Sequence, residues 1–437
     1  METIDTILSG AWVVPAVPEG KVFEDYSILI DNGIIKDILP SSEVVGRYEA
    51  THNIALKDHL LMPGFVNAHC HTPMNLLRGV ADDVPLKTWL ENHIWPLEGK
   101  WADEQFCADG TEMALAELIR SGSTCLADMY FFPEASAEVV SNVGFRASIG
   151  LTVIEFPTKW AKTTDEYFDR CIEVHNEYQH HPMITSHFAP HAPYTVSDDS
   201  MRRIRALCNE LEIPIQMHIH ETQREVDESI EQHGVRPIQR LENLGFLGPD
   251  LMAVHMTALI DEEIDLIAER GVHVMHCPES NMKLASGICP VDRLQKAGIN
   301  VALGTDGTAS NNDLCMIGEM KSAAMLAKIG SGDATAVSAE RAVSMATING
   351  AKALGIDDRV GSLEVGKQAD IIAIDMSQLE QQPLFHPISQ IVYSADKRLV
   401  TDVWVAGKHL MKNRELTSLD LDKILYKAKQ WHKKLSQ

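Results

Sequence analysis

Two histidines, His69 and His71, stand one residue apart in the stretch FVNAHCHTPM. Alternate residues of a β-strand point to the same side, so such a pair at a strand end aims two imidazoles at one point. Neutral imidazoles that converge are typical metal ligands, although one pair alone is weak evidence. Cys70 lies between them on the opposite face, and we interpret it as a packing residue.

Further titratable side chains stand at the ends of other short apolar runs. A single histidine near a strand end is more often a hydrogen-bonded structural residue than a ligand. Repetition at most of the predicted strand ends instead favours one shared polar cavity. The residues concerned are His69, His71, His187, His191, His218, His220, Glu221, His255 and Asp306.

Three imidazoles and one carboxylate from this group form a plausible ligand set for Zn²⁺, with Fe²⁺ as the alternative. We predict the ligands to be His69, His71, His218 and Asp306. Such a set leaves a coordination position for water, whose pKa a divalent cation lowers to about 7. His220 has the same strand parity as His218, so parity alone lets either be the ligand; we expect His220 to lie behind or beside the site.

A hydrolytic reaction at this centre also needs a group that moves protons. Glu221 lies three residues after His218, just past a strand end, where its side chain can reach over a metal. Asp306 can contact both metal and water, and His255 can hold the attacking oxygen in line. The competing interpretation of Glu221 is an exposed loop acid, the usual environment of glutamate.

The elements that must position these residues alternate between short apolar runs and helical patterns. Helices are predicted over 103–122 and over 198–212, the second after Ser197, which can cap it. Eight strands alternating with helices favour a (β/α)8 TIM-like barrel of the α/β class, with its active site at the carboxyl ends of the strands. A doubly wound open sheet is the alternative. The predicted strands are 61–69, 123–129, 145–153, 183–189, 213–220, 251–256, 272–277 and 300–306.

Both ends of the chain read as β-structure. Asn32-Gly33 marks a hairpin within the first sixty residues, and strand–turn–strand patterns recur at 366–375 and 400–413. We therefore predict a small β-sandwich domain built from residues 1–60 and 361–437. The metal-binding barrel would occupy residues 61–360. Helical spacing of apolar residues predicts a helix at the C-terminus, over 421–435.

Composition narrows the class of protein. The 437 residues carry a formal charge of −24, which argues against partners with anionic backbones or surfaces, such as nucleic acids and membranes. Eight scattered cysteines without a C-x-x-C pattern favour reduced thiols in the cytoplasm. The N-terminal stretch lacks the pattern of a signal peptide, and no apolar run reaches membrane-spanning length. A homo-oligomer is compatible with exposed barrel loops.

The motifs resemble those of the metal-dependent amidohydrolase superfamily, in its nucleobase and nucleoside deaminase branch. The resemblance covers nearly the whole chain. Two further stretches, WLENHIWPLE and HAPYTVSD, are similar to members that act on adenosines with a sulfur group on the 5′ carbon. The stretches that carry the superfamily resemblance are PGFVNAHCHTPMNLLRG, MHIHETQREV, HCPESNMKLASGICP, LGTDGTASNNDLCM and GSLEVGKQADIIAID.

The resemblance implies hydrolytic deamination of an adenine ring in a purine nucleoside, with one divalent metal on the four ligands named above. Glu221 would protonate the ring nitrogen, with His255 beside the water. Glu98 would accept hydrogen bonds from the ribose hydroxyls, and His191 would touch the substrate. Trp95 would pack on the nucleoside or belong to the core. The strand at 183–189 has no lysine of the kind that some relatives carboxylate to bridge two metals, which supports a one-metal site.

Arg146 would bind substrate or serve as a buried structural arginine. Alternative activities on the same site are guanine deaminase, adenosine deaminase and triazine hydrolase. A non-catalytic metal-binding barrel is the alternative of another class.

Overall fold

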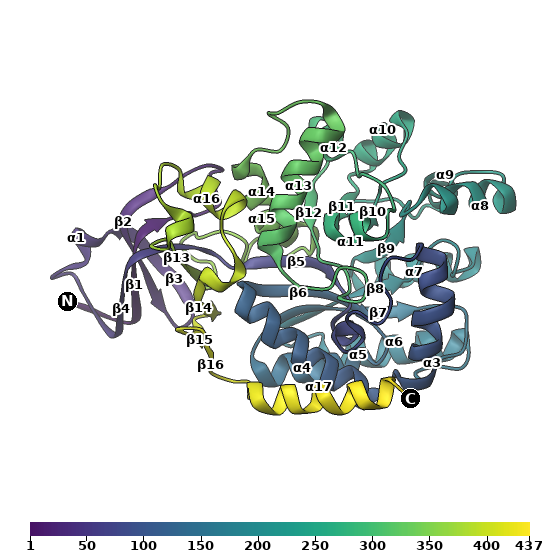
Figure 1. Cartoon of the computed structure of the whole chain (residues 1–437), viewed down its shortest axis with the longest axis horizontal. Helices are drawn as coiled ribbons and strands as arrows, with labels where there is room; N and C mark the ends of the chain where they lie inside the picture. The colour runs from purple at the N-terminus through teal and green to yellow at the C-terminus, as the bar shows by residue number, and fades with distance from the viewer.

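The computed structural model describes residues 1–437 and contains a barrel of eight parallel strands joined in chain order (Figure 1). The last strand approaches the first through a parallel bridge between Cys70 and Asp306, and the Asp306 N–H donates to the His69 carbonyl at 3.0 Å. The predicted barrel is confirmed. Its strands are β5 (Phe65–Cys70), β6 (Ser123–Tyr130), β7 (Arg146–Val153), β8 (Ile184–Pro190), β9 (Ile215–Ile219), β10 (Leu251–His255), β11 (His273–His276) and β12 (Val301–Leu303).

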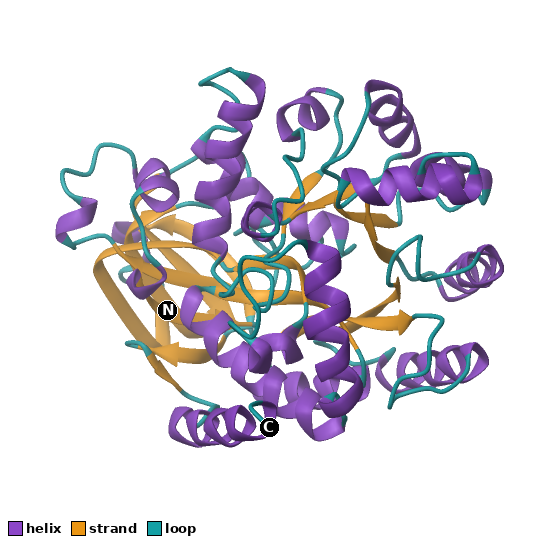
Figure 2. Ribbon diagram, turned by 45° about the vertical axis from the view of Figure 1, so that its right-hand side comes forward, coloured by secondary structure: helices purple, strands orange, loops and turns teal.

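Helices surround these strands on the outside (Figure 2). Two of these helices, α4 and α7, correspond to the two helices predicted from the sequence. The Asp103 side chain caps the start of α4, and the Ser197 hydroxyl caps the start of α7 by accepting from the Ser200 N–H. The α-helices up to β12 are α1 (Ser41–Val44), α2 (Leu86–Trp89), α3 (Trp95–Trp101), α4 (Glu104–Ser121), α5 (Pro133–Val143), α6 (Thr164–Tyr178), α7 (Asp198–Leu211), α8 (Gln223–His233), α9 (Pro237–Asn243), α10 (Asp261–Arg270), α11 (Pro278–Lys283) and α12 (Val291–Lys296).

After the barrel's last strand the chain is helical before it returns to the small sheet. These helices are α13 (Met316–Ser331), α14 (Ala339–Ala346) and α15 (Ile348–Ala353); α16 (Pro387–Tyr393) and α17 (Leu421–Leu435) come later, among and after the C-terminal strands of that sheet. Short 3₁₀ or π segments complete the helical set: η1 (Thr72–Leu77), η2 (Leu90–Ile94), η3 (Leu379–Gln381) and η4 (Lys397–Leu399). No helix is both long and apolar enough to cross a lipid bilayer.

The two ends of the chain pair into one mixed eight-stranded sheet, as the sequence predicts, and this sheet lies beside the barrel (Figure 1). The expected Asn32-Gly33 hairpin joins β2 to β3, and both of its residues have positive φ. The sheet order is β16 (Glu415–Leu416), β15 (Lys408–Lys412), β14 (Val400–Val405), β13 (Ile371–Asp375), β4 (Tyr48–Pro63), β1 (Glu2–Val13), β2 (Phe23–Asp31) and β3 (Ile34–Pro40).

The junction between the two sheets falls at Gly64, inside the strand predicted over 61–69. Residues up to Pro63 belong to β4 and pair with β13, whereas β5 starts at Phe65. A Cβ atom on Gly64 would lie 2.1 Å from the Thr124 side chain, so only glycine fits where the chain passes between sheets. The apolar run is thus divided between two strands, which its composition could not reveal.

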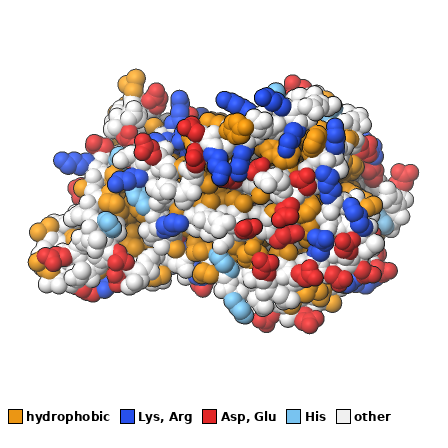
Figure 3. All heavy atoms as spheres, turned by 90° about the horizontal axis from the view of Figure 1, so that it is seen from below, with side chains coloured by type: hydrophobic (Ala, Val, Ile, Leu, Met, Phe, Trp, Pro, Cys, Tyr) orange, Lys and Arg blue, Asp and Glu red, His pale blue; other side chains and the backbone are white.

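The C-terminal helix does not stay with the small sheet. It crosses the barrel and packs along α4, so that it borders the lower edge of the molecule in Figure 1. Its Trp431 is buried and donates to Asp109 at 2.9 Å, and Lys427 pairs with the same carboxylate at 2.8 Å. Figure 3 views the molecule from this side, where acidic and basic side chains are interspersed over the surface.

Candidate active site

The four predicted metal ligands come together at the carboxyl end of the barrel. One potential ligand atom from each of His69, His71, His218 and Asp306 lies within 4.8 Å of the others. The sequence separates the first pair from Asp306 by more than two hundred positions, so only closure of the barrel brings them together. His69 is fully buried, and the other three are at least largely so.

The ring orientation of each histidine is set by a hydrogen bond from Nδ1. His218 Nδ1 donates to the His191 carbonyl at 2.7 Å, and His71 Nδ1 donates to the Met129 carbonyl. His69 Nδ1 lies 2.7 Å from Gln216 Oε1, and the Gln216 amide N–H₂ donates to the Ala68 carbonyl at 2.9 Å. Because these acceptors fix the proton on Nδ1, each Nε2 carries a free lone pair.

This arrangement suits a cation. His69 Nε2 and His218 Nε2 face one another at 3.2 Å, although both are acceptors and have no proton to share. His71 Nε2 and His69 Nε2 lie 3.1 and 3.4 Å from Asp306 Oδ1. Three imidazole lone pairs and a carboxylate facing one point form the donor set that Zn²⁺ and Fe²⁺ prefer.

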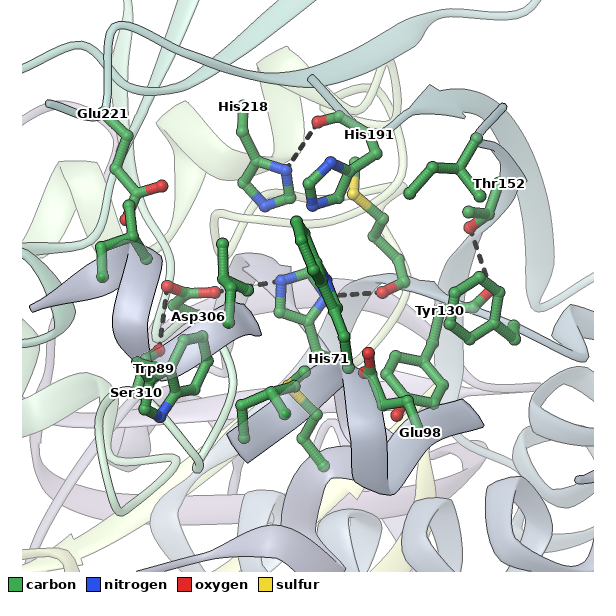
Figure 4. A pocket seen from close by; sticks show the side chains of 18 of the residues that line it. His71, Trp89, Glu98, Tyr130, Thr152, His191, His218, Glu221, Asp306 and Ser310 are labelled. Carbon is green, nitrogen blue, oxygen red and sulfur yellow. Dashed lines mark hydrogen bonds and ion pairs between the residues drawn. The ribbon is translucent and has the colours of Figure 1, made fainter. Parts of the chain in front are cut away.

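Asp306 is held as a carboxylate by its surroundings. Burial raises its pKa, but interaction with the His69 and His71 rings outweighs burial and lowers the pKa well below its usual range. Its Oδ2 accepts from the hydroxyls of Ser280 at 2.6 Å and Ser310 at 3.0 Å, the second of which is drawn in Figure 4. Asp306 is therefore ionised, as a metal-binding carboxylate must be.

Left-handed backbone places several of these side chains. His220, His255 and Asp306 have φ of 53°, 75° and 60°, values that non-glycine residues rarely adopt. Each stands at or just past a strand end, where the chain leaves the barrel wall. Strained backbone of this kind persists only where surrounding contacts determine it, and it is concentrated at functional sites.

Glu221 and His255 lie next to the metal-ligand group. Glu221 Oε2 is 3.9 Å from His255 Nε2, and the Ser286 hydroxyl approaches Glu221 Oε1 at 3.5 Å. His255 Nδ1 meets the Asn281 side-chain oxygen at 2.9 Å, so its Nε2 faces the cavity as an acceptor. Burial, followed by repulsion from Asp306, raises the pKa of Glu221 to about 8. A carboxyl group in this state can donate a proton at neutral pH.

A cavity of about 750 Å³, counting its open mouth, spans the site. Glu221 and Glu98 lie on opposite sides of His71 along it (Figure 4). Burial raises the pKa of Glu98 to about 6, while the neighbouring Tyr130 hydroxyl lowers it. The cavity is therefore bordered by two carboxyl groups of shifted pKa, with the ligand group between them.

His191 and Trp95 also line this cavity. The His191 ring stacks obliquely on His218 at 5.1 Å, and burial lowers the pKa of His191 to about 3, which keeps it neutral. Trp95 begins α3 and lies 5.9 Å from the Phe156 ring, between centroids. Their predicted contacts with a nucleoside remain predictions.

Arg146 does not reach the cavity. It is the first residue of β7, at the amino end of the barrel, and only 2% of it is exposed. Its guanidinium donates to both Asp370 oxygens, at 2.9 and 3.0 Å, and to Gln368. This placement corrects the substrate-binding prediction and supports the structural alternative, because both partners precede β13 and the pair ties the barrel to the small sheet.

Neither His220 nor His187 belongs to the ligand group. The left-handed turn at His220 directs its ring toward Glu263 Oε2, 3.6 Å from Nδ1, and the Ile238 N–H. His187 Nδ1 bonds to the Ser148 hydroxyl at 2.8 Å inside the barrel. Strand parity allowed either His218 or His220 to be the metal ligand. The left-handed turn at His220 directs its ring elsewhere, so His218 is the one that joins the ligand group.

Comparison with known proteins identifies the family. The sequence model of the Amidohydrolase family matches residues 60–410.

The chain belongs to the amidohydrolase family.

Among curated relatives, this amidohydrolase is similar to the 5-methylthioadenosine/S-adenosylhomocysteine deaminase of Teredinibacter turnerae. The two are 49% identical over 433 residues, which cover 99% of this chain and 98% of the relative.

Solved structures agree with this assignment. An adenosine deaminase from Xanthomonas campestris with bound zinc superimposes with a TM-score of 0.99 at 49% identity, over 100% of this amidohydrolase and 99% of that chain. The zinc-complexed atrazine chlorohydrolase of Arthrobacter aurescens superimposes with a TM-score of 0.91, over 98% and 99% of the two chains. At 21% identity, the second likeness shows the shared fold alone.

Proposed function

We propose that this amidohydrolase removes the amino group of the adenine ring in 5′-methylthioadenosine, S-adenosylhomocysteine or both, releasing ammonia and an inosine-type product. The observation that carries the proposal is Glu221, whose raised pKa places a proton donor beside the four-residue ligand group. The full-length similarity to a deaminase of these nucleosides supports the substrate class.

We propose Zn²⁺ as the resident cation, held by His69, His71, His218 and Asp306, with Fe²⁺ as the alternative. The zinc in the Xanthomonas campestris relative supports this choice. When bound, such a cation lowers the pKa of a coordinated water to about 7 and so supplies a nucleophile at neutral pH.

The residues of the chain move the protons. Asp306, held as a carboxylate, accepts the proton of the attacking water. Glu221 donates to the ring nitrogen next to the attacked carbon, C6 of adenine, which draws electron density away from that carbon. The free Nε2 of His255 orients the attacking oxygen by accepting its hydrogen bond. Asp306 then delivers the proton it accepted to the departing nitrogen, and the proton of the added hydroxyl returns to Glu221, so the nitrogen leaves as neutral ammonia and both carboxyl groups regain their starting states.

The two ends of the cavity set the pose of the substrate. The purine edge lies toward Glu221, and Glu98 accepts hydrogen bonds from the ribose hydroxyls at the other side of His71. His191 contacts the nucleoside, and Trp95 provides an apolar surface on which it packs. Because this pose uses the ribose hydroxyls, it favours a nucleoside over a free base as the substrate.

Plain adenosine is the second candidate substrate, because the name of the similar zinc-containing structure is that of an adenosine deaminase. Guanine deamination and triazine hydrolysis fit the position of Glu98 less well, since neither substrate has ribose hydroxyls. A non-catalytic barrel has no use for a buried proton donor beside the ligand group, where burial raises its free energy.

The decisive experiment measures ammonia release from methylthioadenosine, S-adenosylhomocysteine, adenosine, adenine and guanine on protein of known metal content. We expect turnover of the adenine nucleosides and little from adenine or guanine. Glu221→Gln is the matched variant: it should keep its metal and lose about 100-fold or more in kcat, the usual contribution of a general acid. Full activity in that variant would remove the assigned role.

A further inference from the structure

The proton donor Glu221 stands on a bend that the backbone does not favour. Strand β9 ends at Ile219, and His220 follows with a φ of 53°. Non-glycine residues rarely adopt this region, and they persist there only where surrounding contacts hold them. Because Glu221 is the next residue, the position of its carboxyl group depends on what maintains this bend.

Glu225 maintains it. Its Oε1 accepts from the His220 N–H at 3.0 Å, and its Oε2 accepts from the Glu221 N–H at 2.8 Å. Glu225 lies in the first turn of α8, where the Thr222 hydroxyl in turn accepts from the Glu225 N–H at 3.3 Å. The two oxygens of one carboxyl group thus join both peptide groups of the bend to the start of a helix.

The same motif occurs at the start of α6, where it holds nothing catalytic. There the Thr163 hydroxyl accepts from the Glu166 N–H at 3.2 Å, and Glu166 Oε2 accepts from the Lys162 N–H at 2.7 Å. The Glu166 side chain is 38% exposed, whereas Glu225 as a whole is 8% exposed. A threonine–glutamate cap therefore does not require burial of the carboxylate.

Burial of Glu225 is unfavourable for helix capping alone. It raises the pKa of Glu225 to about 8, although the two backbone N–H groups lower it, and the charge of Glu221 raises it further. Glu225 is not among the residues that line the catalytic cavity; it lines a neighbouring pocket that shares Glu221 and Trp95 with that cavity. Its second hydrogen bond, to the His220 N–H, is the feature that α6 lacks.

We propose that Glu225 is a positioning residue for proton transfer: by holding the His220–Glu221 bend, it keeps the Glu221 carboxyl group beside His255. This inference rests on the proposed deaminase function. If Glu221 is displaced, Glu98 and His191 still bind the nucleoside. The displaced Glu221 carboxyl group, however, delivers its proton less often. The loss should therefore appear in kcat rather than in KM.

The test compares four variants of the metal-loaded full chain: Glu225→Ala, Glu225→Gln, Glu166→Ala and Glu166→Gln. We expect kcat to fall about 10- to 100-fold in Glu225→Ala, as a small misplacement of a reacting group does, with KM and metal content unchanged. Glu225→Gln can keep only one of the two acceptor bonds and should lose less. Both Glu166 variants should retain kcat.

Amide hydrogen exchange gives a readout that does not depend on activity. The amides of residues 220 and 221 should exchange faster in Glu225→Ala, and that of residue 162 in Glu166→Ala. Unchanged kcat in a folded Glu225→Ala protein, or unchanged exchange at 220 and 221, would overturn the inference. If Glu225→Ala does not fold, Glu225→Gln decides by the same two measurements. Absence of deamination in the unmodified protein would instead refute the proposed function, while exchange would still test the bend.

Discussion

The two ends of the barrel use buried charge in opposite ways. At the amino end, Arg146 and Asp370 satisfy one another with two hydrogen bonds, and Asp370 also accepts from the Ala406 N–H at 2.7 Å. At the carboxyl end, the Glu221 carboxyl group has one long hydrogen bond, at 3.5 Å from Ser286, and lies 3.9 Å from His255, while two histidine lone pairs face one another. Paired charge stabilises the fold at one end; unpaired groups at the other end are available for a ligand and for proton transfer.

His69→Ala removes a metal ligand at the carboxyl end and should produce the largest loss of activity. Loss of one imidazole opens the ligand group, so we expect loss of bound metal together with a fall in activity of about 1,000-fold or more, since the cation provides several kcal/mol of transition-state stabilisation. Metal analysis and ammonia release measure the two losses. A fully metallated and active variant would show that the ligand set is wrong.

Arg146→Met tests the amino end. It leaves the Asp370 carboxylate buried without its partner, so the free energy of unfolding should fall by about 3–5 kcal/mol, measured by denaturant titration. The value of kcat in the protein that remains folded should be unchanged. Arg398→Met, at an exposed pair with Asp396, is the control and should change stability little. A large loss of kcat in folded Arg146→Met would show that Arg146 contributes to the reaction and not to stability alone.

Glu98→Ala tests whether Glu98 binds the ribose hydroxyls of the substrate. Hydrogen bonds to a charged acceptor contribute about 1.5–3 kcal/mol, so kcat/KM for an adenine nucleoside should fall about 10- to 100-fold. Any residual activity on free adenine should not change, because adenine has no ribose. Equal losses on both substrates would place Glu98 elsewhere in the reaction.

The pH profile should show the smallest effect. Glu221 must be protonated to act as an acid, so activity declines as rising pH removes its proton, with an alkaline limb at or below its pKa of about 8, because a bound cation favours the carboxylate. We expect kcat/KM, measured from neutral to alkaline pH, to lose this limb in Glu221→Gln. An identical limb in that variant would assign it to another group.

The sequence was most informative where apolar runs end in polar residues. Those runs predicted the barrel strands and the four ligands, because strand ends of a barrel converge whatever connects them. The left-handed turns at His220 and Asp306 could not be predicted, since nothing in the residue types requires them. For the same reason, parity alone could not separate His218 from His220.

Supporting residues were the other limit of sequence reasoning. Gln216 orients His69, and Glu225 holds the bend before α8, yet neither was predicted. A glutamine in a strand and a glutamate in a first helical turn are ordinary residues whose partners depend on tertiary contacts. The threonine–x–x–glutamate spacing was a readable capping signal, but it occurs equally at α6.

Strand β4 lies at the centre of the small sheet, between β1 and β13. During synthesis, β1 emerges first and can pair at once, but the other edge of β4 must wait for a partner more than three hundred residues downstream. That edge is an open row of backbone donors and acceptors until β13 has been synthesised. A nascent or truncated chain lacking residues beyond 370 should therefore be prone to self-association, whatever the state of its barrel.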